Sequence, residues 1–265
     1  MKRALSVLGA LLVLAGCAAG AVTQTSSYDR AERPVSQQPT TTEARRKARI
    51  HVELGQAYLE AARYGVALDE AKSAIAYDRT YAPAYQLMGL VHMFLEENPV
   101  AASYFEQALR LAPGDPEIGN SYGWFLCSSG HEKAGLEQLA AVVRNPYYQT
   151  PSRAFTNAGL CHLRLNDDAS AERQFLRALE VEPGNRQALF HLAAISYRRG
   201  VMEATKRYLS ELHEGGEPTA ESLWLLIRVE HRLGDRAAEA SLVQQLRRRF
   251  PASPEFQAFL QGQYK

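Results

Sequence analysis

The sequence lacks most features that catalysis or nucleic-acid binding would require. Its 265 residues include three cysteines, and the formal net charge is +1. It contains no phosphate-binding glycine loop and no nucleophile elbow, and His131-Glu132 lacks the second histidine of a zinc-protease helix. No basic block stands out except Arg247–Arg249. We therefore expect no enzyme, no metal or other cofactor, no nucleic acid and no small-molecule substrate.

Long alternations of valine, isoleucine and threonine are also absent, whereas alanine and leucine are abundant, which favours an all-α protein. The segment from Tyr85 to Pro113 shows how its helices are organised. Gly89 and Ala101 are small enough for two helices to pack closely, and Phe105 lies one turn beyond Ala101 on the same face. This spacing is that of a tetratricopeptide repeat, a helix–turn–helix unit of 34 residues.

The same pattern recurs along the chain. The small position of the first helix falls at Gly55, Gly89, Gly123, Gly159, Ala193 and Ile227, always 34 residues apart except for a step of 36 residues after Gly123. The fold class is thus predicted to be an all-α, right-handed α-α superhelix (solenoid) of six repeats. The predicted repeats are 48–81, 82–115, 116–151, 152–185, 186–219 and 220–253.

The ends of the array are less regular. In the sixth repeat Ile227 and Glu239 stand where small residues are usual, so we expect looser packing there. Residues 254–265 are predicted to form a capping helix in which Phe256, Phe259 and Leu260 cover the last repeat.

The N-terminus has the features of an export signal. Lys2 and Arg3 precede an apolar run that is too short to span a membrane comfortably, and Leu14-Ala15-Gly16-Cys17 follows. This pattern resembles a bacterial lipobox, which implies a signal peptide over 1–16, cleavage before Cys17 and acyl chains, such as palmitate, on the new N-terminus. The alternative is an ordinary secretory signal with an incidental cysteine. Residues 17–47 are polar and are predicted to be a flexible tether.

In tetratricopeptide arrays the first helices line the concave side, and fixed positions of each repeat point into it. Alignment places an apolar patch and a more C-terminal basic strip with one tryptophan on that side. The residues are Leu90, Met93, Phe94 and Trp124 for the patch, and Arg164, Arg198, Trp224, Arg228 and Arg232 for the strip. Such a groove suits a peptide with apolar anchors and acidic groups. The alternative is that the aromatics serve packing and the arginines are solvated.

Two further cysteines, Cys127 and Cys161, lie on the first helices of the neighbouring repeats three and four, at positions 12 and 10 of those repeats. Export permits a disulfide between them, while two buried thiols are the alternative. The histidines His92 and His162 occupy a position where an aromatic side chain normally packs, so both are expected to be core residues.

Three segments carry a more specific resemblance: Asn120–Cys127, the loop Asn145–Pro151 and Asn157–Cys161. They resemble the type IV pilus biogenesis and stability lipoproteins, six-repeat proteins that act as pilotins in several bacteria. The resemblance implies an outer-membrane lipoprotein, anchored by lipid only and facing the periplasm. It also implies pilus secretin subunits as partners, with a role in secretin localisation, multimerisation or pilus stability, and hence in twitching motility. The alternative function is a general periplasmic scaffold for peptidoglycan or outer-membrane protein assembly.

The predicted lipobox can be tested directly. Replacing Cys17 (Cys17→Ala) removes the acylated side chain, so the protein is expected to leave the membrane pellet and appear in the soluble periplasmic fraction. Fractionation followed by immunoblotting measures this. A Cys17→Ala protein that stays in the membrane fraction as the wild type does would contradict lipid anchoring.

Overall fold

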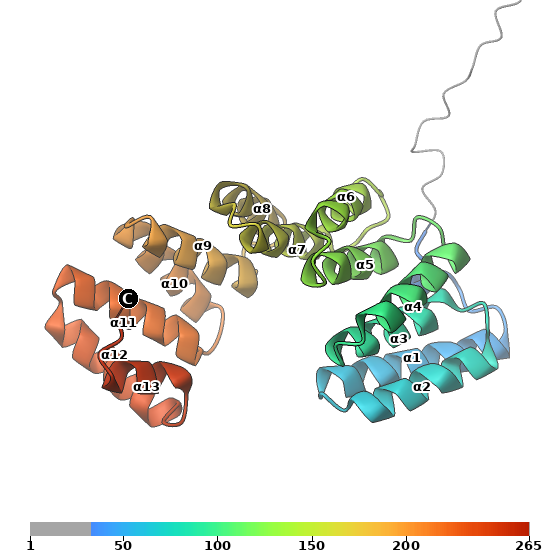
Figure 1. Ribbon diagram of the computed structural model, residues 1–265, viewed down its shortest axis with the longest axis horizontal. Helices are drawn as coiled ribbons and strands as arrows, with labels where there is room; N and C mark the ends of the chain where they lie inside the picture. Colours follow the sequence, from blue (N-terminus) through green and yellow to red (C-terminus); the bar gives the residue numbers. More distant parts are fainter. Residues whose placement is uncertain (1–32, 265) are drawn as a thin grey trace, which may run out of the picture. The chain divides into compact units, whose positions relative to one another are not determined.

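The computed structural model describes residues 33–264. The predicted signal peptide, Cys17 and most of the predicted tether lie outside the described residues. Within 33–264 the chain forms thirteen α-helices and one short 3₁₀ turn, and no strand. None of these helices is long and apolar enough to cross a membrane. The fold is an all-α solenoid of helix pairs, as the periodicity predicts (Figure 1).

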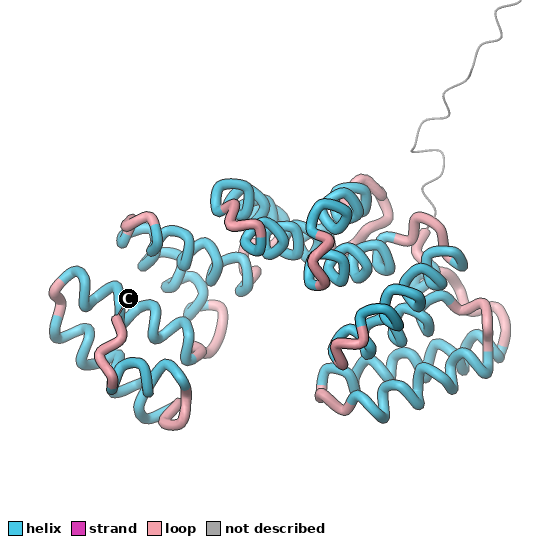
Figure 2. The backbone as a smooth tube through the Cα atoms, viewed as in Figure 1, coloured by secondary structure: helices cyan, strands magenta, loops and turns pink. Residues whose placement is uncertain are grey.

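The first twelve helices form six pairs joined by short turns (Figure 2). The first helices of the pairs are α1 (Glu43–Glu60), α3 (Ala82–Phe94), α5 (Pro116–Ser128), α7 (Pro151–Arg164), α9 (Arg186–Arg198) and α11 (Ala220–Leu233). The second helices are α2 (Tyr64–Tyr77), α4 (Asn98–Leu111), α6 (Glu132–Val142), α8 (Asp168–Val181), α10 (Met202–Glu214) and α12 (Arg236–Arg249). A final helix, α13 (Pro254–Leu260), follows the sixth pair.

Local signals explain where the helices begin. Asp115 caps α5 by accepting hydrogen bonds from the backbone N–H groups of Glu117 and Ile118, which have no partner inside the helix. Proline stands in the first turn of α5, where its missing N–H costs nothing. Thr219 forms a capping box with Ser222 at the start of α11.

The small positions let the two helices of a pair approach closely. A Cβ atom added to Gly159 would lie 2.5 Å from the ring of Phe175, and one added to Gly89 would lie 3.0 Å from the ring of Phe105. Both phenylalanine rings are fully buried. The glycines are therefore required for close packing rather than for an unusual backbone angle.

In the sixth pair the large residues are accommodated in two ways. Ile227 is fully buried in an apolar cluster with Leu223 and Leu246. Glu239 keeps its carboxylate in contact with His231 and Arg236, at 2.9 and 2.7 Å. A carboxylate at this helix–helix contact is tolerated because its oxygens have these partners.

The prediction that Leu260 covers the last repeat is wrong. Leu260 is 60% exposed, whereas Phe256 and Tyr264 pack against the cluster of the sixth pair. The reason is that α13 ends at Leu260 and Gly262, with a φ of 67°, turns the chain back. The turn directs Tyr264, instead of Leu260, onto α11.

The tether prediction is also wrong at its C-terminal end. Helix α1 begins at Glu43 rather than after 47, with Thr42 as its cap. Before it, Pro34 is buried, and the backbone N–H of Val35 donates a 2.7 Å hydrogen bond to the carboxylate of Asp115. Charged residues without apolar periodicity still extend a helix when good helix formers and an ion pair such as Glu43–Lys47 are present.

A half-buried histidine makes the stability of the array depend on pH. His191 on α9 stacks on Phe175, with the ring centroids 5.2 Å apart. Burial, together with the positive charge of Arg198, lowers the pKa of His191 to about 4. Burial also lowers the pKa of His162 and of His213.

These shifts predict a loss of stability in acid. Below about pH 6.5 the unfolded chain takes up a proton at His191 that the folded chain refuses until about pH 4. The free energy of unfolding is expected to fall by about 1–3 kcal/mol between these values on account of His191 alone. Urea unfolding from pH 7 to pH 4 measures it, with His191→Phe as the comparison. Parallel pH profiles for the two proteins would contradict the assignment.

Candidate partner-binding groove

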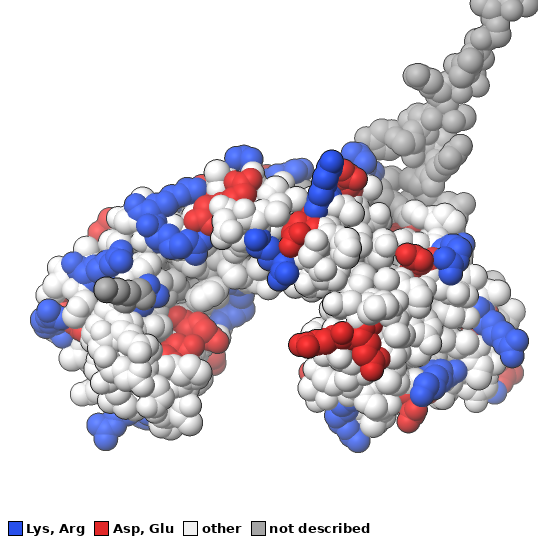
Figure 3. Space-filling view, in the orientation of Figure 1, with Lys and Arg blue, Asp and Glu red and all other residues white. Residues whose placement is uncertain are grey.

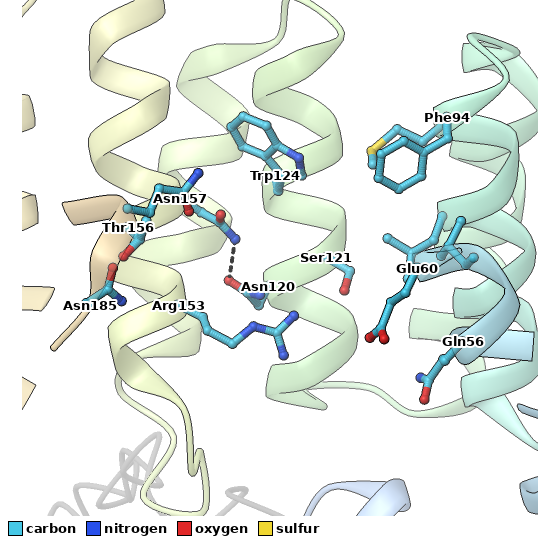
Figure 4. A pocket seen from close by; sticks show the side chains of 14 residues that line it. Gln56, Glu60, Phe94, Asn120, Ser121, Trp124, Arg153, Thr156, Asn157 and Asn185 are labelled. Atoms are coloured by element: carbon cyan, nitrogen blue, oxygen red, sulfur yellow. Dashed lines mark hydrogen bonds between the residues drawn. The ribbon is translucent and has the colours of Figure 1, made fainter. Parts of the chain in front are cut away.

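A groove of about 480 Å³ runs along the first helices of the pairs (Figure 4). It is lined from α1, α3, α5 and α7 and from the start of α9. The lining residues are Gln56, Leu59, Glu60, Leu90, Met93, Phe94, Asn120, Ser121, Trp124, Arg153, Thr156, Asn157, Asn185 and Gln187. All four residues of the predicted apolar patch lie in it.

One side of the groove is apolar. Leu90 and Met93 pack on the core cluster of Phe105 and Phe125, which holds them in place while they remain partly accessible. Phe94 is 52% exposed, and its ring stacks on Tyr64 with the centroids 6.0 Å apart. Exposed apolar side chains gathered in a concave surface are typical of a protein contact.

The other side is lined by amides and hydroxyls. Asn157 donates a 3.0 Å hydrogen bond to the side-chain oxygen of Asn120, and the two residues come from α7 and α5 (Figure 4). Gln86 donates to the hydroxyl of Ser121 at 2.8 Å. These bonds orient the amide groups, whose remaining donors and acceptors match the backbone of a peptide. The charged members of the lining are Glu60 and Arg153.

A disulfide joins α5 to α7 beside the groove. The Cα atoms of Cys127 and Cys161 are 5.4 Å apart, within the range that a disulfide spans. Cys127 follows Trp124 by one helical turn and belongs to the same packed cluster, with Tyr148. The covalent link therefore supports the helix that carries Trp124.

The two-residue insertion of the third repeat lies between α6 and α7. Tyr148 is buried there, and burial raises the pKa of its phenol to about 12. Asn145 donates a hydrogen bond to the carbonyl oxygen of Gly114, 3.3 Å away, so the loop reaches the turn before α5. Tyr147 remains 43% exposed, with the guanidinium of Arg33 5.9 Å from its ring centroid.

Comparison with known proteins agrees with this geometry. Tetratricopeptide repeat models match residues 82–115 and 156–204. The chain is 27% identical over 220 residues to the type IV pilus assembly protein PilF of Pseudomonas aeruginosa, covering 83% of this chain and 87% of PilF.

Two solved structures are similar as well. A Pseudomonas aeruginosa PilF structure matches with 25% identity and a TM-score of 0.71, covering 83% of this chain and all of that one. The structure of PilW, described as a widely conserved type IV pilus biogenesis factor, matches with 27% identity and a TM-score of 0.71, covering 80% and 98% of the two chains. The chain is a homologue of PilF and PilW.

In this PilF/PilW homologue the predicted basic strip does not line the groove. Arg198 is paired with both carboxylate oxygens of Asp168, at 2.6 and 3.0 Å. Arg164 contacts Glu132 at 3.5 Å and donates to the backbone carbonyl of Ser128. These two arginines join neighbouring repeats, and their partners already compensate their charge.

The remaining residues of the strip, Trp224, Arg228 and Arg232, lie on α11. The guanidinium groups of Arg228 and Arg232 lie 4.4 and 4.2 Å from the ring centroid of Tyr197. Trp224 packs against Tyr264 in the C-terminal segment. Figure 3 shows that basic and acidic side chains are interspersed on the visible face, which fits arginines engaged by neighbours. The strip residues thus lie outside the pocket that holds the patch, and their role in partner binding stays a prediction.

Sequence reasoning missed the amide side of the groove and Arg153. Asn120 and Thr156 lie on the first helices of their repeats, but their residue types gave no reason to single them out. The expected core histidines are half-buried: His92 stacks on Tyr104 with the centroids 5.3 Å apart, and His162 lies 3.6 Å from Asp167. Within residues 33–264, no group of three or more His, Cys, Asp or Glu side chains is arranged to hold a metal ion.

The disulfide beside the groove generates a stability prediction. Opening the link between Cys127 and Cys161 frees the intervening segment of the unfolded chain, so reductant is expected to lower the free energy of unfolding by about 2–4 kcal/mol. Guanidinium unfolding with and without dithiothreitol measures the difference. The double variant Cys127→Ala, Cys161→Ala serves as the control, because its midpoint should not respond to reductant. A wild type that is equally unresponsive would refute the structural role.

Proposed function

We propose that this protein is a non-enzymatic scaffold of type IV pilus biogenesis, a pilotin whose groove binds subunits of the pilus secretin. The groove is the observation that carries the proposal, because Leu90, Met93, Phe94 and Trp124 converge in one concave surface opposite ordered amides. Its homologues support the pathway: one is named a type IV pilus assembly protein and another a type IV pilus biogenesis factor.

The mechanism follows from the chemistry of the groove. Apolar side chains of a secretin segment would bury against Phe94 and Trp124, while its backbone would bond to Asn157 and the other amides. Because the chain holds α5 and α7 together covalently, little ordering is needed on binding.

Localisation is part of the same proposal. Acyl chains on Cys17 would hold the protein at the outer membrane, facing the periplasm, and residues up to Arg33 would link them to the array. Anchoring raises the local concentration of bound secretin subunits at the membrane, which favours their assembly into multimers.

The proposal is tested with the full-length lipoprotein solubilised from membranes. The double variant Phe94→Ala, Trp124→Ala removes two aromatic anchors, so co-purification of the secretin is expected to fall at least about tenfold. Secretin multimers and twitching motility should fall with it. Leu176→Ala is the matched control, because Leu176 on α8 is also exposed and lies outside the groove.

Two results would overturn the proposal. One is wild-type secretin multimers in cells where the double variant is folded and present at normal level. The other is a wild-type protein that co-purifies with peptidoglycan or outer-membrane assembly proteins and never with the secretin, which would favour a general envelope scaffold.

A further inference from the structure

The C-terminal segment of the chain lies on the inner face of the sixth repeat. After α13 the chain turns at Gly262, and Tyr264 returns to α11. The phenol ring stacks on the imidazole of His231, with the centroids 3.7 Å apart and the planes 14° apart. It also packs against Trp224, with the centroids 5.5 Å apart.

Two hydrogen bonds add to these aromatic contacts of Tyr264. The hydroxyl of Tyr264 donates a 3.0 Å hydrogen bond to the carboxylate of Glu239. The backbone carbonyl of Tyr264 accepts one from Nε of Arg228, at 3.4 Å. Burial and the Glu239 carboxylate both raise the pKa of the Tyr264 phenol, which keeps the hydroxyl proton available for donation. A side chain and a backbone group of the segment are thus recognised together.

The residues under Tyr264 are the sixth-repeat counterparts of the groove residues. Trp224, Arg228 and His231 follow one another at steps of four and three, so they share one helix face. Arg228 occupies the repeat position of Leu90 and Trp124, and His231 that of Met93. Tyr264 therefore sits where a peptide partner would contact this repeat.

We infer that the inner face of the sixth repeat is a second peptide-docking site, specific for a tyrosine-bearing segment, which the chain's own C-terminus keeps closed. The contacts of Tyr264 indicate the class of ligand. It would carry an aromatic ring that packs on His231 and Trp224, a hydroxyl that donates to Glu239 and a backbone carbonyl that accepts from Arg228. A partner segment with these groups binds by displacing Tyr264.

Exchange of an internal ligand has a measurable consequence. A site that is open for only a small fraction of the time binds an external peptide more weakly by that fraction. Removing the internal ligand removes this reduction in affinity, and the peptide must then bind more tightly to the shortened chain than to the intact one.

The experiment uses Trp224 as its reporter. The sequence contains two tryptophans, so a Trp124→Phe background leaves Trp224 as the only one. The intact chain and a chain that ends at Gly262 are titrated with a synthetic peptide of residues 259–265, and Trp224 emission is followed. Matched peptides carry alanine or phenylalanine in place of the tyrosine.

The shortened chain is expected to bind the tyrosine peptide saturably, at least about tenfold more tightly than the intact chain. The alanine peptide should not bind, and the phenylalanine peptide should bind several-fold more weakly, because it offers Glu239 no hydroxyl. If circular dichroism shows that the shortened chain has lost its helices, full-length Tyr264→Ala replaces it with the same expectation. Tyr147→Ala is its control and should behave as the intact chain.

Three outcomes would overturn the inference. They are superimposable titrations of the open and intact chains, equal binding of the tyrosine and alanine peptides, and no saturable binding to a folded open chain. Any of these would mean that Tyr264 serves only as part of the C-terminal cap.

Discussion

The rest of the structure depends on the close approach of two helices at a glycine. At Gly159 the helix pair leaves no room for even one methyl group beside Phe175, and Gly89 is similarly tight against Phe105. Because the pairs recur every 34 residues, with one step of 36, successive first helices lie side by side in one register. Residues at the same repeat position then share a face, which is how side chains from α1, α3, α5 and α7 come to line one groove. The groove is thus a consequence of packing, and its chemistry is free to vary.

The repeat pattern determines the helix packing but not the chemistry of the groove, and this difference explains what the sequence could predict. Periodicity alone was enough for the all-α solenoid, and repeat register was enough to bring together Leu90, Met93, Phe94 and Trp124. Register specifies only the side of a helix, and not the partner that a long side chain finds. Arg198 therefore could not be placed correctly, since its pairing with Asp168 joins positions 30 residues apart that no repeat template relates. The amides were missed because asparagine at a concave position carries no signal until Asn120 and Asn157 are seen to bond.

Sequence reasoning also failed at both ends of the array, for a common physical reason. A repeat in the middle has neighbours that bury its faces, whereas an end must be covered by residues outside the pattern. Near the N-terminal end, residues 33–38 pack along repeats one to three through Val35 and its bond to Asp115, a course outside the repeat pattern. At the C-terminal end, α13 is short, and Tyr264 completes the cover that Leu260 was expected to provide. Neither segment has a counterpart elsewhere in the chain from which its course could be read.

The middle of the array is restrained differently, and the two extra residues of the third repeat contribute to this. Near their C-terminal ends, α5 and α7 are joined by the disulfide between Cys127 and Cys161. Near their N-terminal ends, the inserted loop packs Tyr148 into the same cluster, and Asn145 bonds back to the turn before α5. The two helices that carry Trp124, Asn120 and Asn157 are thus held at both ends. Restraint of this kind lowers the conformational entropy that a partner must remove on binding, so the insertion acts on the groove without lining it.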